Sequence, residues 1–275
     1  MWRHAPGGFK VKADNTPIPE KRDHGPLPLF YKEPVLLRFE EHGEAALLPA
    51  RNFDFAREAV AVPLCISEFA VAMRHYPIVF AMEDNAPPIA LVGIRRHDNL
   101  FVALDGTWRP GTYIPAYLRR YPFIVTETHD RTRQFLSVDR RSERFVACAS
   151  THKNAERLFD ADGNASTTAK SAMAFCHAYH MDQTATVAFC QALIAAKLLT
   201  PYHAEFQLPD GSRHQVNGFQ SVDEKAFRAL SAKTVADWHV KGWLDLVTIH
   251  LLSQRSFQNL LDLNAQRANE RKALV

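Results

Sequence analysis

Short apolar runs separated by turn-forming residues fill the part of the chain between residues 29 and 150. Turn chemistry of the Asp-Gly type lies among them, as at Asp105-Gly106. Runs of this length, rich in β-branched and aromatic residues, predict strands. The predicted strands are 78–80, 89–92, 100–104, 123–125, 135–138 and 145–148. One helix over residues 67–75 is expected among them, because Ser67 can cap it and Pro77 ends it.

A helical pattern extends from about residue 166 to residue 199, because no Gly or Pro occurs between Ala165 and Thr200. Apolar residues recur in it at intervals of three and four, which places them on one helix face. Pro201 is expected to end the helix, since proline has no amide N–H to donate. The predicted buried face consists of Val187, Cys190, Ile194 and Leu198.

A hairpin and further helices are predicted for the rest of the chain. Alternating polar and apolar residues over 204–216 flank an Asp210-Gly211 turn. Ser221 or Asp223 can cap the helix that follows. The buried faces of the next helical region are marked by Trp238, Leu244, Ile249, Leu252, Leu260 and Leu261. Strands first and helices later favour an α+β fold, with predominantly antiparallel strands of the N-terminal half packed against long helices of the C-terminal half.

The distribution of Pro, Gly and apolar residues predicts one domain with an extension at each end. Residues 1–28 combine Pro and Gly with little apolar periodicity, which is typical of a flexible arm. Apolar content stays high over residues 29–263, which we interpret as a single domain. Residues 264–275 are polar with mixed charges, and we expect them to form a polar tail, the frayed end of a helix.

Composition excludes several classes of protein. Hydrophobic residues make up 47% of the chain and charged residues 23%, as in soluble globular proteins. The net charge is only +3, so no nucleic-acid partner is expected. No run approaches the roughly 18–20 apolar residues that cross a bilayer, and the N-terminus lacks the apolar stretch of a signal peptide. These features predict a soluble, cytoplasmic protein without a membrane span.

Four cysteines lie in apolar surroundings, without the paired spacing of zinc or redox sites. We expect Cys65, Cys148, Cys176 and Cys190 to be buried free thiols, with no disulfide, as in a reducing compartment. Cys65 precedes the helix predicted from residue 67, where a thiolate would be stabilised. A buried structural thiol is nevertheless the favoured interpretation.

Recognised catalytic and cofactor-binding motifs are missing from the chain. It contains no Gly-x-Ser-x-Gly elbow, no phosphate-binding glycine loop and no His-Glu-x-x-His motif. His177 and His180 are three residues apart on the predicted helix, a spacing that suits a metal ion. A solvated polar stripe is the favoured interpretation. We therefore predict no metal site, and the sequence identifies no cofactor.

The most unusual segment covers residues 106–123, where aromatic rings alternate with guanidinium groups. Such a combination suits a planar or anionic ligand, or a peptide. Tyr117 and Tyr121 are four residues apart and would form a two-ring platform on a helix. The alternative is a loop whose aromatic residues plug the sheet. If a ligand binds, its contacts are expected at His75, Tyr76, Trp108, Tyr113, Tyr117, Arg119, Arg120 and Tyr121.

Two adjacent cations in this segment are expected to have different roles. Arg119 and Arg120 would point about 100° apart in a helical turn, so they cannot both face one ligand. One of them should anchor the segment through Glu68 or Asp105, while the other faces the ligand.

Motifs in three groups follow one another along the chain. The first group is Ala61-Val-Pro-Leu64, Ser67-Glu-Phe69 and His75-Tyr-Pro-Ile-Val-Phe80. The second is Asn99-Leu-Phe-Val102, Asp105-Gly106, Trp108 and Tyr113-Ile-Pro-Ala-Tyr117-Leu-Arg-Arg-Tyr-Pro-Phe123. The third is Leu158-Phe-Asp160, Asp162-Gly163, Leu208-Pro-Asp-Gly211, Gly218-Phe-Gln220, Val222-Asp-Glu224, His250-Leu-Leu-Ser253 and Phe257. Together they resemble the signatures of the SapC family over about residues 29–262.

The resemblance implies a link to the cell envelope. The family takes its name from a locus for a paracrystalline surface-layer protein, where a secretion or assembly role was proposed. Relatives occur near outer-membrane receptors and flavin-dependent halogenase-like proteins, and the family provides no catalytic residues to transfer.

Three hypotheses follow from the motifs and the resemblance. The leading one is an accessory protein that binds a small molecule or peptide through residues 106–123, with a homo-oligomer as a further expectation. The alternative is an enzyme, metal-dependent and oxygenase-like or hydrolytic, that uses His75, His250 and carboxylates in one cleft. A structural subunit of an envelope assembly is the third.

Overall fold

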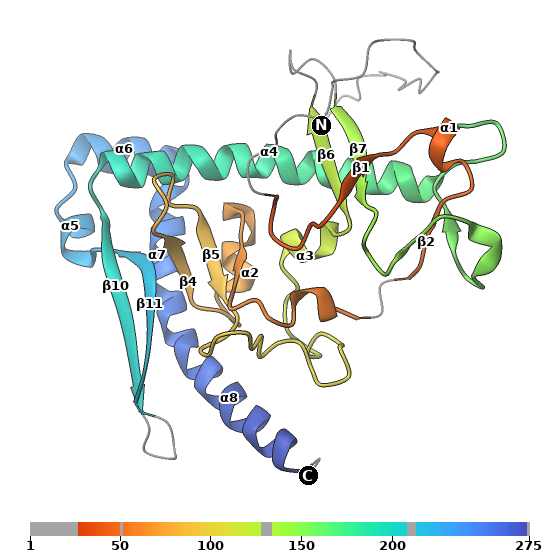
Figure 1. Cartoon of the computed structure of the whole chain (residues 1–275). Helices are drawn as coiled ribbons and strands as arrows, with labels where there is room; N and C mark the ends of the chain where they lie inside the picture. Colours follow the sequence, from red (N-terminus) through yellow and green to blue (C-terminus); the bar gives the residue numbers. More distant parts are fainter. Residues whose placement is uncertain (1–26, 50–51, 128–133, 208–212, 274–275) are drawn as a thin grey trace. The chain divides into compact units, whose positions relative to one another are not determined.

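The computed structural model describes residues 27–49, 52–127, 134–207 and 213–273 (Figure 1). Helices account for 41% and strands for 21%, and the sheets are antiparallel, so the predicted α+β class is confirmed. The chain divides into two compact units, of which the first contains residues 1–50 and 120–177. The second contains residues 51–119 and 178–275.

The single domain predicted over residues 29–263 includes parts of both units and stays a prediction. The chain leaves the first unit after residue 50 and returns to it at residue 120. Apolar content along the sequence does not show where the chain passes from one unit to the other, because both units contain buried apolar residues. Of the arm predicted over residues 1–28, residues 1–26 lie outside the described residues.

Two small antiparallel sheets form the first unit, with the strand orders β1-β7-β6 and β8-β2-β9. The elements are β1 (Pro34–Leu36), α1 (Phe39–His42), β2 (Ala46–Leu47), β6 (Phe123–Glu127), β7 (Gln134–Asp139), β8 (Phe145–Val146) and β9 (Glu156–Arg157). The helix α4 (Thr167–Ala195) begins in this unit and adds Ala169 and Cys176 to its core. The larger members of that core are Leu47, Phe123, Val138, Leu158 and Phe159.

The second unit is built on a five-stranded sheet with the order β10-β11-β4-β5-β3 (Figure 1). Its strands are β3 (Ala61–Pro63), β4 (Ile78–Ala81), β5 (Pro88–Leu91), β10 (Leu199–Gln207) and β11 (Arg213–Val222). Two of these strands come from the C-terminal half of the chain, so the sheet is less confined to the N-terminal half than predicted. The predicted hairpin is β10–β11, and its turn lies outside the described residues.

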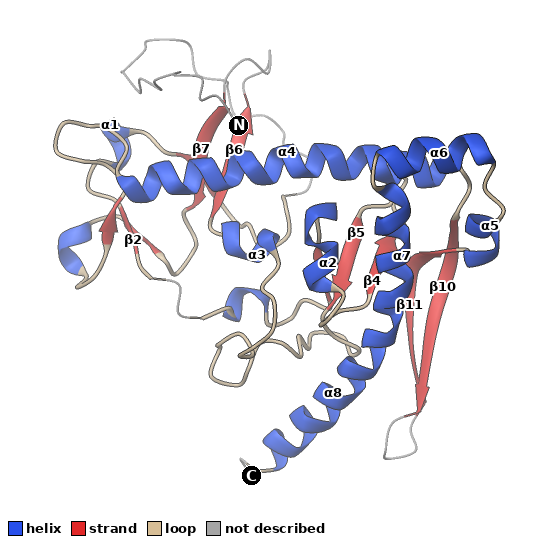
Figure 2. Ribbon diagram, turned by 180° about the vertical axis from the view of Figure 1, so that it is seen from behind, coloured by secondary structure: helices blue, strands red, loops and turns tan. Residues whose placement is uncertain are grey.

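Helices of the second unit are mostly from the C-terminal half. They are α2 (Phe69–Ala72), α3 (Ala116–Arg120), α5 (Glu224–Arg228), α6 (Ala232–Val240), α7 (Trp243–Ser253) and α8 (Phe257–Lys272), in addition to the second part of α4. The helix α7 lies beside β4 and β11 (Figure 2). In the core, the ring of Phe80 is 6.4 Å from that of Phe189 and 5.0 Å from that of His250. Of the two predicted caps, Ser221 and Asp223, it is Asp223 that caps α5 by accepting from the amides of Lys225 and Ala226.

The helix α4 ends earlier than the sequence pattern predicts. Lys197 has a left-handed backbone (φ 54°), and its amide donates to the carbonyl of Ile194. The amide of Leu198 donates to the carbonyl of Leu193, which completes a Schellman motif. The prediction that Pro201 ends the helix is therefore wrong, because Pro201 already lies in β10.

The buried face of α4 also differs from the predicted one. Phe189, Cys190 and Leu193 are buried, whereas Val187 and Ile194 are about 40% exposed. Spacing alone cannot decide between two neighbouring faces of a helix that is apolar on several sides. In α4 the buried face is the one that carries Phe189, whose large ring packs on Phe69 and Phe80.

The strand predicted over residues 100–104 does not form. Side chains from distant segments bond its backbone carbonyls. Arg109 donates to the carbonyl of Leu100 over 2.7 Å, and Arg267 donates to the carbonyl of Val102 over 2.5 Å. Arg267 is itself buried on α8, together with Asn264. Residues 264–272 are thus the packed end of α8 and differ from the predicted polar tail.

The four cysteines are free, as predicted. Cys148 differs from the other three because it is only partly buried. Its pKa is lowered from the ordinary thiol value by hydrogen bonds from Ser150. None of the described helices is both long and apolar enough to cross a membrane.

Candidate functional site

A buried carboxylate, Glu68, ties together the segment that the sequence singled out. Glu68 closes the short 3-10 helix Ile66–Glu68, whose N-cap is Cys65 rather than the predicted Ser67. The amide of Cys65 donates to Glu68 Oε2 over 2.8 Å. The other oxygen, Oε1, accepts from the Tyr113 hydroxyl at 3.0 Å and from the Ala116 amide at 2.7 Å.

Burial raises the pKa of Glu68, while the three hydrogen bonds oppose that shift by favouring the charged carboxylate. Each of its two oxygens already has a donor of this chain. The chemistry of this arrangement is therefore that of an anchor, which holds residues 113–116 against the helix start.

Arg119 reaches the same anchor indirectly. Its guanidinium donates to the Tyr113 hydroxyl and to the Ile114 carbonyl, both over 3.0 Å, and lies 5.6 Å from the centre of the Tyr113 ring. Asp105, the other predicted partner, accepts instead from Thr107. The expected arginine–carboxylate anchor is replaced by tyrosine and backbone donors, because Tyr113 stands between Arg119 and Glu68.

Most of the predicted aromatic contacts are buried in the core. Tyr76 is fully buried, and its hydroxyl donates to the Tyr113 carbonyl. The Phe101 ring packs against both Tyr76 and Trp108, with ring centroids 4.5 Å and 5.8 Å away respectively. Tyr117 is buried against Tyr179 of α4. For these side chains the structure matches the alternative interpretation of residues 106–123, in which the rings plug the fold.

Arg120 and Tyr121 belong to the first unit. Tyr121 is buried against Tyr31, and its hydroxyl donates to Asp139 over 3.2 Å. The Arg120 guanidinium lies 5.6 Å from the centre of the Tyr31 ring. The expected platform of Tyr117 and Tyr121 is not formed, because α3 ends at Arg120 and the two rings pack in separate surroundings.

The two histidines of the enzyme hypothesis differ in their surroundings. His250 is completely buried, and its Nδ1 donates to the Ile78 carbonyl over 2.8 Å. Its Nε2 accepts from the Val222 amide over 3.1 Å, so both ring nitrogens serve the fold. Burial lowers the pKa of His250 to about 4. His75 is half-buried beside Tyr76, and burial and the nearby Arg74 lower its pKa.

The remaining candidates for chemistry are structural as well. Burial, with Asp182 and Glu68 nearby, raises the pKa of Cys65 to about 12, which confirms the interpretation as a structural thiol. His177 pairs with Gln134 over 2.9 Å. Within the described ranges, no group of three or more His, Cys, Asp and Glu side chains is arranged to hold a metal ion.

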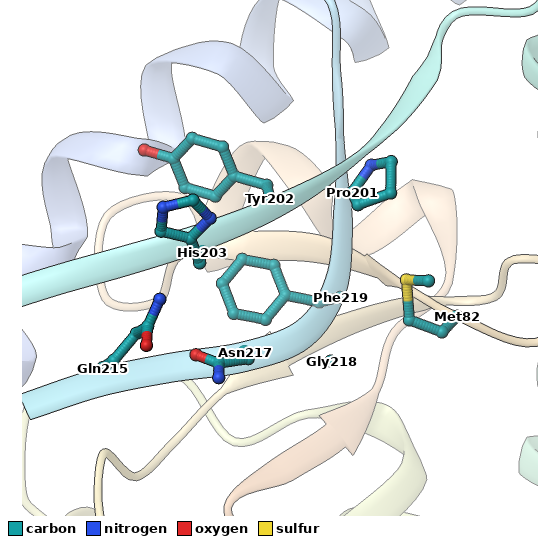
Figure 3. Close-up of a pocket in the computed structure, with 8 residues that line it drawn as sticks. All are labelled: Met82, Pro201, Tyr202, His203, Gln215, Asn217, Gly218 and Phe219. Atoms are coloured by element: carbon teal, nitrogen blue, oxygen red, sulfur yellow. The ribbon is translucent and has the colours of Figure 1, made fainter.

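An open depression of about 230 Å³ lies on the β10–β11 hairpin of the second unit (Figure 3). It is lined by Met82, Pro201, Tyr202, His203, Gln215, Asn217, Gly218 and Phe219. The Phe219 ring lies between the two strands and forms the floor, while Tyr202 and His203 project from β10 (Figure 3). Tyr202 is 41% exposed and Met82 is 53% exposed, so large apolar side chains face solvent here.

A β-bulge creates the depression. Tyr202 pairs with Phe219 and Ala204 pairs with Val216, so His203 faces two residues of β11, Asn217 and Gly218. A bulge bends its strand and changes the direction of neighbouring side chains. Gly218 has φ +87°, a backbone conformation that side-chain-bearing residues rarely adopt, so glycine is required at the bend.

This depression combines an apolar floor with a polar rim. Gln215 and Asn217 are exposed amides at its edge, and His203 is an exposed imidazole. Binding sites of this kind use apolar surface for affinity and a few polar groups for orientation. None of the lining residues was among the predicted contacts. The local signal was the glycine at position 218 inside a strand pattern, which marks a bulge.

Comparison with protein families returned one finding. The SapC family matches residues 37–260, a range that includes both compact units. It agrees with the motifs that the sequence analysis assigned to this family. No curated protein and no solved structure is similar enough to the chain to count as a match.

Proposed function

This chain belongs to the SapC family, and we propose that it is a non-catalytic accessory protein that binds a peptide segment through the depression on the β10–β11 hairpin. Its partner would be a component of cell-envelope or surface-layer processes, which the family name suggests. The proposed compartment is the cytoplasm, where cysteines remain free thiols.

The observation that carries the proposal is the depression itself. It brings exposed apolar side chains, Met82 and Tyr202, next to exposed polar groups such as His203 and Asn217. Exposed apolar groups rimmed by polar residues are typical of interaction sites. The Glu68 anchor lacks this property, because its polar atoms are already bonded within the chain.

Size and depth favour a peptide over a small molecule. Pockets for small ligands usually enclose about 300–1,000 Å³ and bury most of the ligand. The depression is smaller, at about 230 Å³, and its walls are open to solvent. It can accept one large side chain of a peptide whose backbone is held elsewhere. For this reason we place a peptide, rather than a metabolite, in the site.

His75, Tyr113 and Arg119 remain predicted ligand contacts, because their side chains are partly or fully exposed. They lie on a segment held by Glu68, which would present them in a fixed arrangement. The enzyme alternative is less favoured, because His250 uses both ring nitrogens in the core.

A peptide array tests the proposal. The full chain is applied to capped heptapeptides of varied composition, alongside the variants Tyr202→Ala and Leu104→Ala. Leu104 is the matched control, since it is 39% exposed, close to the 41% of Tyr202, and lies outside the depression. Peptides bound by the protein should be retained by Leu104→Ala and weakened about five-fold or more by Tyr202→Ala. Equal binding by both variants, or no bound peptide, contradicts the proposal.

A further inference from the structure

The strand β10 forms an edge of the five-stranded sheet. It is nine residues long and pairs with β11 on one side, and no described strand pairs with its other side. Along such an edge, alternate backbone N–H and C=O groups point away from the sheet and are available to another strand. Pro201 lies in this strand, as is typical of edges, where no amide donor is required.

The edge is open where the depression lies. Exposed residues follow one another along it: Thr200, Pro201, Tyr202, His203 and Glu205. A strand added at this edge would lie about 4.7–4.9 Å from β10, so its side chains would stand beside those of β10. The side chain next to Tyr202 would then reach the depression. The edge of β10 would provide backbone pairing, and the depression would provide a pocket for a side chain.

Three exposed carboxylates lie close to the depression in the chain or on its strands, and one of them, Glu205, is 3.9 Å from the imidazole of His203. Glu83 and Asp84 directly follow Met82 and are exposed, and Glu205 on β10 is exposed too. Among the described residues that line the depression, none is Lys or Arg. A partner with positive charge is therefore complementary to this surface, and a partner with negative charge is repelled.

We propose that the outer edge of β10 takes up an extended basic peptide as an added strand, with an apolar side chain of that peptide in the depression. This inference rests on the proposed function and specifies its partner. Main-chain hydrogen bonds supply affinity in such complexes, and the pocket for an alternate side chain supplies specificity. Lys or Arg residues that flank the apolar side chain meet Glu83, Asp84 and Glu205.

A second copy of this chain fits the same edge less well. If two β10 edges paired in the register that sets Glu205 opposite Glu205, the carboxylates of the two copies would lie together. Like charges across paired strands are destabilising. The basic peptide is therefore the occupant to which the charges point.

The experiment uses two capped, fluorescein-labelled peptides with the full chain. One has the sequence Thr-Arg-Val-Phe-Val-Lys-Thr, and the other carries Glu in place of Arg and Lys. The basic peptide should bind about ten-fold or more tightly than the acidic one, and its affinity should fall as salt rises to about 0.5 M. Equal affinities of the two peptides would overturn the charge argument and with it the inference.

Backbone methylation separates strand addition from side-chain docking. Two forms of the basic peptide carry N-methyl groups on alternate residues, one set for each edge of the added strand. The set whose amides face β10 should weaken binding about ten-fold, while the other set should have little effect. Equal effects of the two sets would mean that the peptide does not pair with β10.

Protein variants distinguish peptide binding at the depression from strand addition at β10. If Tyr202→Ala weakens the basic peptide but the two methylated sets behave alike, the proposed function stands and strand addition is wrong. If Tyr202→Ala and Leu104→Ala both bind as the unchanged protein does, the depression is not the site and both fail. Glu205→Gln should weaken the basic peptide and reduce its salt dependence, and its folding is checked by circular dichroism.

Discussion

Two regions of the second unit treat their polar side chains in opposite ways. Around Glu68, both carboxylate oxygens accept from donors of the chain, and Arg119 is bonded to the Tyr113 hydroxyl and the Ile114 carbonyl. On the β10–β11 hairpin, Gln215 and Asn217 are exposed at the rim of the depression. The first region uses its polar groups to hold the fold, and the second presents them to solvent.

The difference teaches where function is to be sought in this protein. A dense cluster of aromatic and cationic residues in a sequence suggests a binding site. When such residues are buried, however, their polar groups are hydrogen-bonded within the protein and are not available to a ligand. Substitutions in the first region should therefore cost stability. Those at the depression should cost binding.

The largest effect on stability is expected for Arg267→Ala. Arg267 is buried on α8, with hydrogen bonds to Asp98 over 3.1 Å and to the Val102 carbonyl over 2.5 Å. Removing one partner of a buried ion pair leaves the other charge uncompensated. The free energy of unfolding should fall by about 3–5 kcal/mol, as measured by urea denaturation.

Arg271 provides the matched control. It bonds the same Asp98 oxygen over 3.2 Å, but its side chain is 55% exposed. Because exposed pairs contribute little, Arg271→Ala should lower the free energy of unfolding by less than about 1 kcal/mol. Similar losses for the two variants would show that burial of Arg267 does not determine its contribution.

A pH effect of comparable size should come from His250. Its pKa is lowered from 6.5 to about 4 in the fold, so the unfolded chain takes up this proton more readily. The stabilisation is present above pH 6.5 and is lost as pH falls towards 4. The loss amounts to about 3 kcal/mol in the free energy of unfolding.

Denaturation at several pH values measures this loss against His250→Gln. The variant is expected to be less stable at pH 7, because it cannot serve both Val222 and Ile78 in the same way. Its stability should also depend less on pH between 6.5 and 4. Identical pH profiles of the two proteins would assign the titration to other groups.

A smaller loss is expected when the Glu68 anchor is changed to an amide. In Glu68→Gln, one carboxylate oxygen becomes an NH₂ group, which faces a donor such as the Cys65 amide. An unsatisfied buried donor costs about 1–3 kcal/mol. Hydrogen exchange should accelerate at whichever backbone amide, that of Cys65 or that of Ala116, then faces the NH₂ group and loses its acceptor. Glu58→Gln is the control, since the Glu58 side chain is 79% exposed. Unchanged hydrogen exchange at both the Cys65 and the Ala116 amides in Glu68→Gln would contradict the anchor.

How much of the fold was accessible from the sequence depends on the range of the interactions. The existence of one long helix and of the β10–β11 hairpin follows from local patterns and was predicted correctly. Asp223 was one of the two predicted caps, whereas the end and the buried face of α4 were predicted wrongly. The strand expected over residues 100–104 failed, because Arg267 binds its carbonyls from more than 160 positions away in the chain. Local propensity contains no information about such a partner.

The candidate site shows the same limit. Residues 106–123 were selected by residue type. Glu68 was one of two predicted carboxylate partners of an arginine, and its donors are instead Cys65, Tyr113 and Ala116. The depression combines Met82 with two strands that lie more than 100 residues further along the chain. Only the glycine at position 218 marked it locally. When a site is formed by segments that are distant in the chain, no single segment has a sequence pattern that predicts it.

The smallest effect on stability is expected at the rim of the depression. Gln215 and Asn217 are exposed, and Gln215→Ala or Asn217→Ala should change the free energy of unfolding by less than about 0.5 kcal/mol. Gly218→Ala is the internal contrast. No atom lies within 4 Å of the added methyl group, but φ +87° strains any residue with a side chain, so a loss of about 1–2 kcal/mol is expected. Urea denaturation of the three variants measures these changes. A large loss for Gln215→Ala or Asn217→Ala would place the rim among the structural regions and remove the contrast with Glu68.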